Sequence, residues 1–461
     1  MYKPNKSILI VALIIAFFVV GWLYRDSFTS YFFQDDWFTF KISSVSTVEG
    51  IITFFKPRTD VIYYRPLGMQ IPFFVMGNIF GFNPLPYRIL TYVIIMVSSS
   101  VVFIMSYQLT KNQLGSILAA FLYATSATHY IPMYWFSTFP FVLGPLLFFL
   151  SVLFIILYSK SGVRKYYLLS IIAFLLGLFT YEIIAVVPLV LVVYYLLFNK
   201  TLNLGKLIPF FIGDGVLILI KFVLFPASAG SIYSISFNRQ TLVNLYSYVL
   251  WIFNWPEEMK AQMIRFMTFN PVFVSGFRIF VMIFTIGLSI LFISLIIIPV
   301  ITILKSKSNH HIRLCLLGLW WFIVGLLPVL LFPYHTYSYY LPVSLAGILI
   351  PLCFGATSIT TSPKYRWVNI ISTLLIIGVW VTLTATTIQF NKNIYWAPQR
   401  AKISERLVME AINEKYDNPS KTKFNFPSGS ENKLSLNDQD ALQVIFHDPS
   451  VITEYGIGIQ K

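Results

Sequence analysis

Long apolar runs recur along most of this chain and leave it few folds to adopt. They fall near residues 7–24, 88–109, 114–129, 139–158, 166–180, 183–198, 207–226, 277–304, 314–332, 340–359 and 367–388. An α-helix needs roughly 20 such residues to cross the hydrocarbon layer of a bilayer. The runs therefore predict an all-α polytopic membrane protein with about 11 transmembrane helices.

Composition agrees with a membrane protein and excludes several other classes. Hydrophobic residues make up 57% of the chain and charged residues only 11%, more apolar surface than a soluble domain uses. The first run lacks a small-residue cleavage site after it, which predicts a retained span. The two cysteines, Cys315 and Cys353, lie inside apolar runs and indicate neither a disulfide framework nor a metal site.

The net charge of +15 follows membrane topology and does not indicate nucleic-acid binding. Loops on one side carry only basic residues, such as Lys160, Arg164 and Lys165. Of the 18 acidic residues, all but Asp214 fall outside those loops and outside the spans. Because basic loops remain cytoplasmic, we expect a cytoplasmic N-terminus and an extracytoplasmic C-terminus. The basic residues would then contact anionic membrane lipids.

Two outer segments are the largest. The first outer loop spans residues 25–87 and contains an apolar stretch over 66–82, which predicts a helix lying at the membrane interface. The chain then divides into a transmembrane domain over 1–390 and an extracytoplasmic tail over 391–461. In the tail, Ile403, Leu407, Ala411 and Ile412 predict one amphipathic helix. Residues 425–429 predict a turn, and 441–446 fit a helix or a strand.

Adjacent carboxylates, Asp35 and Asp36, follow the first span and lie among aromatic residues. Neighbouring acids near a membrane repel one another and lose solvation, so they often mark chemistry or ion binding. Their pKa values separate, which leaves one of them available as a base near neutral pH. Helix-capping aspartates in a solvated turn are the alternative.

Other ionisable side chains at the outer ends of spans complete the candidate site. Arg65 and Arg88 are placed to contact an anionic group such as a lipid phosphate, and interfacial snorkelling is the alternative for both. Glu182 occupies a tight outer turn and predicts a second carboxylate facing the acidic pair, with a hydrated loop acid as the alternative. His335 lies in a tyrosine-rich turn and is a candidate phosphate donor or a structural histidine.

Asp214 and Lys221 are the charged pair inside a span. They are seven residues apart, which places them on one helical face and predicts a structural contact within the membrane. A transporter would use such a pair in a translocation path. Catalytic Ser-His-Asp orderings, phosphate-binding glycine loops and metal-spaced Cys or His clusters are absent from the sequence.

Four places carry a family resemblance. They are the acidic pair at 33–37, the stretches 64–67 and 80–88, the turn Thr180-Tyr181-Glu182, and the late segments 321–328 and Tyr339-Tyr340-Leu341-Pro342. In this order they resemble the GT-C superfamily of membrane glycosyltransferases, in particular protein O-mannosyltransferase relatives and lipid-A aminoarabinose transferases. The resemblance covers about residues 7–360.

The resemblance implies a reaction and roles for residues. A polyprenyl-phosphate-linked sugar enters from the bilayer, and an acid of the first outer loop activates the acceptor, with inversion at the sugar carbon. Asp35 or Asp36 would be that base, Arg88 and His335 phosphate contacts, and Glu182 an acceptor or loop-positioning group. Tyr339, in the late motif, is counted with the substrate-binding residues. Relatives often have Arg or Lys before this motif, where His335 is here the nearest ionisable group.

The sequence thus favours an inverting glycosyltransferase on the extracytoplasmic face. A transporter or flippase of lipid-linked saccharides and a non-catalytic subunit of a cell-envelope assembly are the alternatives. A transporter should line mid-membrane positions with ionisable groups, whereas here only Asp214 and Lys221 lie inside a span. The sugar, the acceptor (glycan, lipid or protein), a divalent-cation requirement and the choice between Asp35 and Asp36 remain open.

Overall fold

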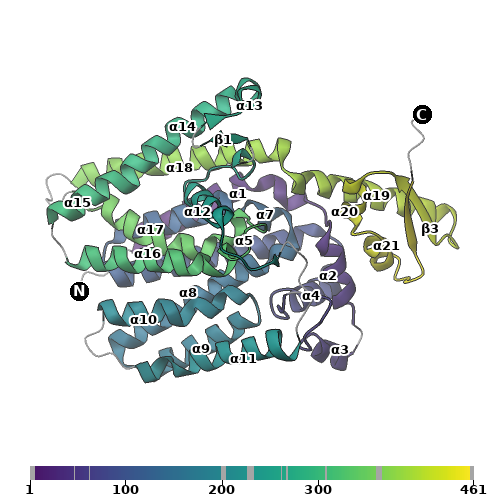
Figure 1. Ribbon diagram of the computed structural model, residues 1–461, viewed down its shortest axis with the longest axis horizontal. Helices are drawn as coiled ribbons and strands as arrows, with labels where there is room; N and C mark the ends of the chain where they lie inside the picture. Colours follow the sequence, from purple (N-terminus) through teal and green to yellow (C-terminus); the bar gives the residue numbers. More distant parts are fainter. Residues whose placement is uncertain are drawn as a thin grey trace.

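The computed structural model is a set of long helices laid side by side, with a smaller mixed α/β unit at one end (Figure 1). It describes residues 6–45, 47–61, 63–198, 204–225, 233–260, 262–265, 268–306, 309–359 and 366–456. The mixed unit, residues 396–456, is called the C-terminal unit below. The short helices of the first outer loop lie at the same end of the molecule (Figure 1).

The chain is helical over most of its described length. The helices before the C-terminal unit are α1 (Lys6–Leu23), α2 (Asp35–Ser43), α3 (Val48–Thr53), α4 (Gln70–Phe80), α5 (Pro84–Thr110), α6 (Gln113–Ala124), α7 (Tyr130–Tyr134), α8 (Pro140–Ser161), α9 (Arg164–Leu178), α10 (Val187–Phe198), α11 (Ile208–Ile218), α12 (Arg239–Ile252), α13 (Pro271–Gly276), α14 (Arg278–Phe292), α15 (Ile298–Ser306), α16 (Asn309–Leu330), α17 (Pro342–Ala356) and α18 (Arg366–Ile394). A small antiparallel hairpin pairs β1 (Met263–Arg265) with β2 (Thr268–Phe269).

Helix length and apolar character identify a polytopic membrane protein, as predicted. Within the described residues, 5 helices are long and apolar enough to cross a membrane, and they are Pro84–Thr110, Phe136–Ser161, Arg278–Thr302, Asn309–Leu330 and Trp367–Ile394. Shorter apolar helices are Ser7–Leu23, Gln70–Phe80, Glu182–Phe198 and Pro342–Ala356. The count of about 11 transmembrane helices remains a prediction.

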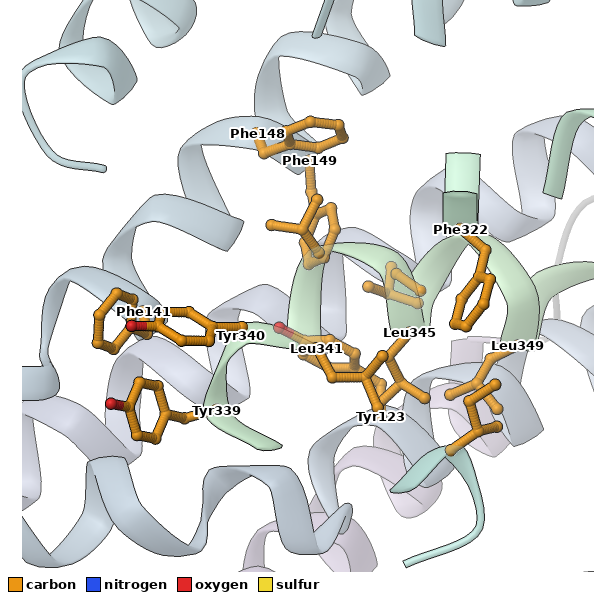
Figure 2. Close-up of a cluster of buried hydrophobic side chains, with 14 of the residues drawn as sticks. Tyr123, Phe141, Phe148, Phe149, Phe322, Tyr339, Tyr340, Leu341, Leu345 and Leu349 are labelled. Atoms are coloured by element: carbon orange, nitrogen blue, oxygen red, sulfur yellow. The ribbon is translucent and has the colours of Figure 1, made fainter. Parts of the chain in front are cut away.

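The interior of the helical part is aromatic and tightly packed. Helix α8 packs on α5 and α9, and α16 packs on α17. The two helices of the latter pair approach closely at Gly347, where an added Cβ would lie 2.6 Å from the Trp321 ring. Figure 2 shows part of this core, in which Tyr339 and Tyr340 lie beside Phe141. Tyr339 and Tyr340 lie just before the start of α17, and their contact with Phe141 places them beside the start of α8.

The first outer loop folds into short helices rather than one long segment. The apolar stretch predicted to form an interfacial helix is α4, which begins four residues after Pro66 and ends at Phe80. Its residues Phe73 and Met76 pack on α2 in a second apolar cluster that also contains Trp37. Helix α4 therefore supports the segment that presents the acidic pair.

The C-terminal unit corrects one expectation and resolves another. It contains α19 (Trp396–Asp417), β3 (Lys423–Pro427), α20 (Ser430–Leu436), α21 (Asp440–Ile445) and β4 (Ile452–Gly456). The turn predicted at 425–429 is instead largely strand β3, which pairs in parallel with β4 because Phe424 and Phe426 alternate into the unit's core. Residues 441–446 are mostly helical.

The amphipathic helix predicted at the start of the tail is α19. Leu407 and Ala411 are fully buried, and Ile403 packs on the same cluster, as expected. Ile412 is instead 37% exposed, because it lies one residue beyond Ala411 and therefore about 100° around the helix.

The predicted contact between Asp214 and Lys221 is wrong. The Lys221 Nζ donates to the Val61 carbonyl oxygen in the first outer loop at 2.8 Å, and Asp214 Oδ1 has no partner among the described residues. Seven residues along an α-helix separate two positions by about 10 Å, and a π-helical turn over Leu219–Leu224 changes the direction of Lys221. Lys221 thus reaches toward the loop and away from Asp214.

Candidate active site

The two acidic residues after the first span point into different surroundings. Asp36 is fully buried, and its Oδ1 accepts hydrogen bonds from the Ser137 backbone N–H at 2.7 Å and the Ser137 hydroxyl at 2.8 Å. Its Oδ2 accepts from the Phe33 N–H at 3.3 Å. The pKa of Asp36 is raised to about 6, because the effect of burial exceeds the opposing effects of Arg88 and of these hydrogen bonds. The carboxylate of Asp36 is therefore held by partners on several sides.

Asp35 is half-buried, and within the described part of the chain its carboxylate has no recorded hydrogen bond or ion pair. Its own backbone carbonyl accepts from the Thr39 hydroxyl at 2.7 Å, within helix α2. The pKa of Asp35 is raised to about 6, because the effect of burial exceeds that of the positive charge of Arg400, which lowers it. A carboxylate that is desolvated and unpaired near neutral pH has the properties of a general base.

The backbone before Asp35 has an unusual conformation that sets the direction in which helix α2 begins. Gln34 has φ +52° and ψ −125°, and the Asp36 N–H donates to the Phe33 carbonyl at 3.1 Å. These values define a type II′ turn over Phe33–Asp36, with Gln34 where glycine is preferred. Helix α2 begins at Asp35, the second central residue of this turn, and its N-terminal dipole favours acidic residues there.

Arg65 and Glu182 form a partly buried ion pair. The Arg65 Nε donates to Glu182 Oε2 at 2.8 Å, and the Tyr64 N–H donates to Oε1 at 3.2 Å. The loop reaches this turn through Gly68, where an added Cβ would lie 2.5 Å from the Thr180 carbonyl oxygen. Glu182 was predicted to face the acidic pair, and its ion-pair partner is instead Arg65.

The Arg65 guanidinium is enclosed by aromatic rings. Its central carbon lies 5.1 Å from the Tyr63 ring centroid, 4.9 Å from Phe141 and 5.3 Å from Tyr181. Only its Nε takes part in a recorded hydrogen bond among the described residues, so the two terminal nitrogens keep donors for a ligand. Arginine among aromatic rings with free donors suits a phosphate or a similar anion.

Asp35 and Arg65 have tyrosine neighbours in common, because the charges of both residues affect the same tyrosines. The Asp35 charge raises the pKa of Tyr63, Tyr233 and Tyr337, after the larger effect of burial on each. Arg65 lies close enough to Tyr63 and Tyr233 to lower their pKa values. We call the set Asp35, Tyr63, Arg65, Tyr233, His335, Tyr337 and Arg400 the acid–tyrosine cluster.

His335 lies inside this cluster. Its ring is 4.6 Å from that of Tyr233 and 5.0 Å from that of Tyr337, between centroids. Burial, and to a smaller extent the positive charge of Arg65, lower the pKa of His335 to about 4. The imidazole is neutral at physiological pH, so it can meet a phosphate as a hydrogen-bond donor but not as a cation.

Arg88 and Tyr339, the two remaining predicted site residues, do not belong to the acid–tyrosine cluster. Arg88 is fully buried, and its Nη2 donates to the Ser30 carbonyl at 3.1 Å, whereas its Nε and Nη1 have no partner in the described structure. It belongs to the surroundings of Asp36. Tyr339 is 4% exposed and stacks on Phe141 with centroids 4.8 Å apart (Figure 2). Tyr339 thus supports one ring of the Arg65 enclosure.

Arg400 and Tyr233 belong to the cluster but were not predicted from the sequence, and neither was Glu257, a buried acid whose charge acts on Tyr337. Glu257 accepts from the Ser338 N–H at 2.8 Å and from the Tyr395 hydroxyl at 2.9 Å, and burial raises its pKa to about 6. An acid among aromatic residues, Trp255-Pro256-Glu257, is a signal similar to that of Asp35. For Arg400 no local signal exists, because it lies in the polar tail. Among the described residues, no group of three or more His, Cys, Asp or Glu is arranged to hold a metal ion.

Comparison with known proteins identifies the fold. No protein-family model and no curated protein matches the chain. The solved structure of ArnT from Cupriavidus metallidurans in the apo state aligns with a TM-score of 0.51 and 11% identity, covering 98% of this chain and 89% of that one. The same protein bound to undecaprenyl phosphate aligns with a TM-score of 0.51 and 10% identity, covering 98% and 90%. The predicted GT-C resemblance is therefore confirmed at the level of the fold.

Proposed function

We propose that this chain is an inverting glycosyltransferase that moves a sugar from a polyprenyl-phosphate donor to an acceptor on the extracytoplasmic face of the membrane. The observation that carries the proposal is the carboxylate of Asp35, which has no hydrogen bond or ion pair among the described residues and lies, like Arg65, close enough to Tyr63 and Tyr233 to shift their pKa values. The fold is shared with a protein that has been seen bound to undecaprenyl phosphate, and this supports a lipid-phosphate donor.

The acid–tyrosine cluster supplies both halves of a displacement at the sugar carbon. Asp35 takes the proton of an acceptor hydroxyl as its oxygen attacks C1 of the sugar, forming the new glycosidic bond. The bond from C1 to the phosphate oxygen breaks, and its electron pair leaves with the lipid phosphate. Attack opposite the leaving group inverts the configuration at C1. The reaction needs a base and stabilisation of the departing negative charge.

Arg65 is the better candidate for contact with the donor phosphate. Its terminal nitrogens have no recorded partner among the described residues, and it lies in the same cluster as Asp35. Arg88, also predicted as a phosphate contact, is fully buried beside Asp36. We assign Arg88 a structural role and His335 that of a neutral hydrogen-bond donor to the phosphate.

Asp36 and Glu182 are positioning residues in this proposal. Asp36 fixes the first turn of α2 against Ser137, so that Asp35 projects into the cluster. Glu182 holds the Arg65 side chain by one nitrogen and leaves the other two for the donor. The transporter alternative receives less support, because Lys221 bonds to a loop carbonyl rather than to Asp214.

The test is glycosyl transfer by the purified protein in detergent, with a panel of polyprenyl-phosphate sugars and cell-envelope acceptors. Released lipid phosphate and glycosylated acceptor are both measured. Asp35→Asn should lower kcat by about 100-fold or more, as expected for loss of a general base. Asp60→Asn is the matched control, since Asp60 lies in the same loop, is exposed and pairs with Arg58.

The outcomes separate the site from the function. If the wild type is active and Asp35→Asn retains that activity, Asp35 is not the base. Vectorial movement of a lipid-linked sugar across a vesicle membrane, without lipid-phosphate release, would support the transporter. Anomeric configuration of the product, read by NMR, tests inversion directly.

A further inference from the structure

The C-terminal unit is joined to the start of α2 by side chains and backbone. The Lys41 Nζ donates to Asp440 Oδ1 and to Gln443 Oε1, both at 2.7 Å. The Trp37 indole N–H donates to the Ser404 hydroxyl at 3.0 Å. The unit thus packs directly on the helix whose first turn carries the proposed base.

The C-terminal unit also makes two hydrogen bonds with Gln34, the residue before Asp35. Its backbone N–H donates to the Ser435 carbonyl on α20 at 2.9 Å. Its side-chain Oε1 accepts from Arg400 Nη1 at 2.7 Å. Both groups that hold Gln34 therefore come from the C-terminal unit, more than 360 residues away in the chain.

Gln34 needs to be held, because its backbone lies where side chains are disfavoured. With φ +52° and ψ −125°, it occupies the first central position of a type II′ turn, for which glycine is the preferred residue. Non-glycine residues persist in such regions only where the surrounding structure imposes the conformation. Relaxation of Gln34 to negative φ would rotate the following carboxylate out of the cluster.

Arg400 is built for this contact. Its Nε and Nη2 donate to the two oxygens of Glu431 at 2.7 and 3.0 Å, which fixes the plane of the guanidinium. Its central carbon lies 4.7 Å from the Trp396 ring centroid. The third nitrogen, Nη1, is left to bind Gln34, and the side chain is only 15% exposed. Lysine has neither this planar shape nor the three directed donors.

We propose that the C-terminal unit is a clamp for the catalytic turn, in which Arg400 and the Ser435 carbonyl hold Gln34 in the type II′ conformation and so aim Asp35 at the acceptor. Arg400 is a positioning residue, since it acts through Gln34. The proposal rests on the glycosyltransferase function proposed above. It assigns the tail a part in the reaction that acts through Gln34.

Replacement of Gln34 by glycine gives the sharpest test. Glycine adopts the type II′ conformation without support, so a turn with glycine at this position should no longer need Arg400. The set of full-length variants is Arg400→Met, Gln34→Gly, the double Gln34→Gly/Arg400→Met, and Arg406→Met as the matched control. Arg406 lies on the same helix, is 61% exposed and pairs with Glu410.

The first readout is steady-state glycosyl transfer. Arg400→Met should lower kcat by about 10- to 100-fold, the scale of a misplaced catalytic group, with little change in KM for the donor. The double variant should have the kcat of Gln34→Gly alone. Equal losses for Arg400→Met in both backgrounds would show that Arg400 acts on substrate or charge directly and would overturn the clamp.

The second readout does not depend on activity. Hydrogen–deuterium exchange of the peptide covering residues 33–43 should be faster by about tenfold in Arg400→Met and unchanged in Arg406→Met. In the double variant it should return to the rate of Gln34→Gly. Exchange that is the same in Arg400→Met and wild type would overturn the proposal. If the wild type transfers no sugar, the proposed function fails in that assay, and the exchange rates still decide whether the clamp exists.

Discussion

Asp35 and Asp36 are adjacent in the sequence, yet the structure gives their carboxylates opposite surroundings. Around Asp36 lie Ser137 and Arg88, which supply hydrogen bonds and a compensating charge in a fully buried site. Around Asp35 lie tyrosines and the more distant charge of Arg400, without a recorded hydrogen bond in the described structure. Burial raises the pKa of both to about 6.

Two adjacent aspartates can therefore serve as a structural acid and a reactive acid, because their partners differ. A buried carboxylate whose lone pairs are satisfied is tolerated in the fold, and its removal leaves its partners unsatisfied. A desolvated carboxylate without partners destabilises the fold and gains reactivity toward a proton. Both residues lie in the first turn of α2, where consecutive side chains are about 100° apart around the helix and so enter different surroundings.

The largest expected effect is on stability and distinguishes the two aspartates. Asp36→Asn should lower the free energy of unfolding by about 3 kcal/mol, because Arg88 then remains buried without a countercharge. Asp35→Asn should leave it unchanged or raise it, because no partner is lost. Equilibrium unfolding in mixed micelles of a mild detergent and SDS measures both. Equal stability of the two variants would contradict the division of roles.

A double substitution sharpens the assignment of the Asp36 surroundings. Arg88→Met should destabilise the protein, because Asp36 then keeps its charge without the guanidinium. Adding Asp36→Asn should recover about 2 kcal/mol of that loss, since neither charge remains. The same unfolding experiment, applied to the wild type, both single variants and the double variant, gives the double-mutant cycle. Additive losses would show that Asp36 and Arg88 do not interact.

The pH dependence of catalysis tests the Asp35 side. Since the base must be ionised, kcat/KM should fall about tenfold per pH unit below pH 6. Asp36 and Glu257 have pKa values in the same range as Asp35. The Arg400→Met variant therefore shows which acid causes the fall in kcat/KM at low pH, called the acidic limb. Arg400 lowers the pKa of Asp35, and its loss should move the limb to higher pH. A limb that stays in place belongs to another acid.

Stability should depend on pH in the opposite sense to activity. Both aspartates have folded-state pKa values near 6, above the ordinary value of 3.8, so the folded protein binds protons more tightly than the unfolded chain. The free energy of unfolding should therefore fall as the pH rises from about 4 to about 6. Asp35→Asn should remove part of this fall, which unfolding titrations at several pH values would show.

The smallest expected effect concerns two buried serines. Ser137→Ala removes one hydrogen bond to the Asp36 carboxylate and should lower the free energy of unfolding by about 1 kcal/mol. Ser43→Ala is the matched control, because the Ser43 hydroxyl is buried on α2 and has no partner in the described structure. That control should be neutral or slightly stabilising. A larger loss from Ser43→Ala than from Ser137→Ala would contradict this account of the helix.

Much of the architecture could be predicted from local patterns. Apolar runs identify helices that satisfy their own backbone hydrogen bonds, which is the requirement a bilayer imposes. The acidic pair among aromatic residues and the arginines of the same loop mark the candidate site, and Asp35, Arg65 and His335 do lie in one cluster. Periodicity also predicts α19, because a helix repeats its buried face every three to four residues.

Strand β3 and the contact between Asp214 and Lys221 show where local patterns fail. The strand is stabilised by pairing with β4, which follows it after two helices. The charged pair shares a face by spacing alone, but its side chains are too short to meet along the helix axis. Both the pairing of β3 with β4 and the contact of Lys221 with Val61 depend on residues distant in the sequence, which local patterns do not reveal.

The class of protein, the place of the acidic pair and the kind of chemistry available to its residues can all be read from the amino-acid sequence. The folded chain is needed to show that the Asp35 carboxylate has no hydrogen bond among the described residues while Asp36 does, that Glu182 pairs with Arg65, and that Arg400 contacts Gln34. The difference lies in the distance along the chain over which the interactions act. Hydropathy and charge act residue by residue, whereas the desolvation and partners that set a carboxylate's reactivity come from segments brought together by folding.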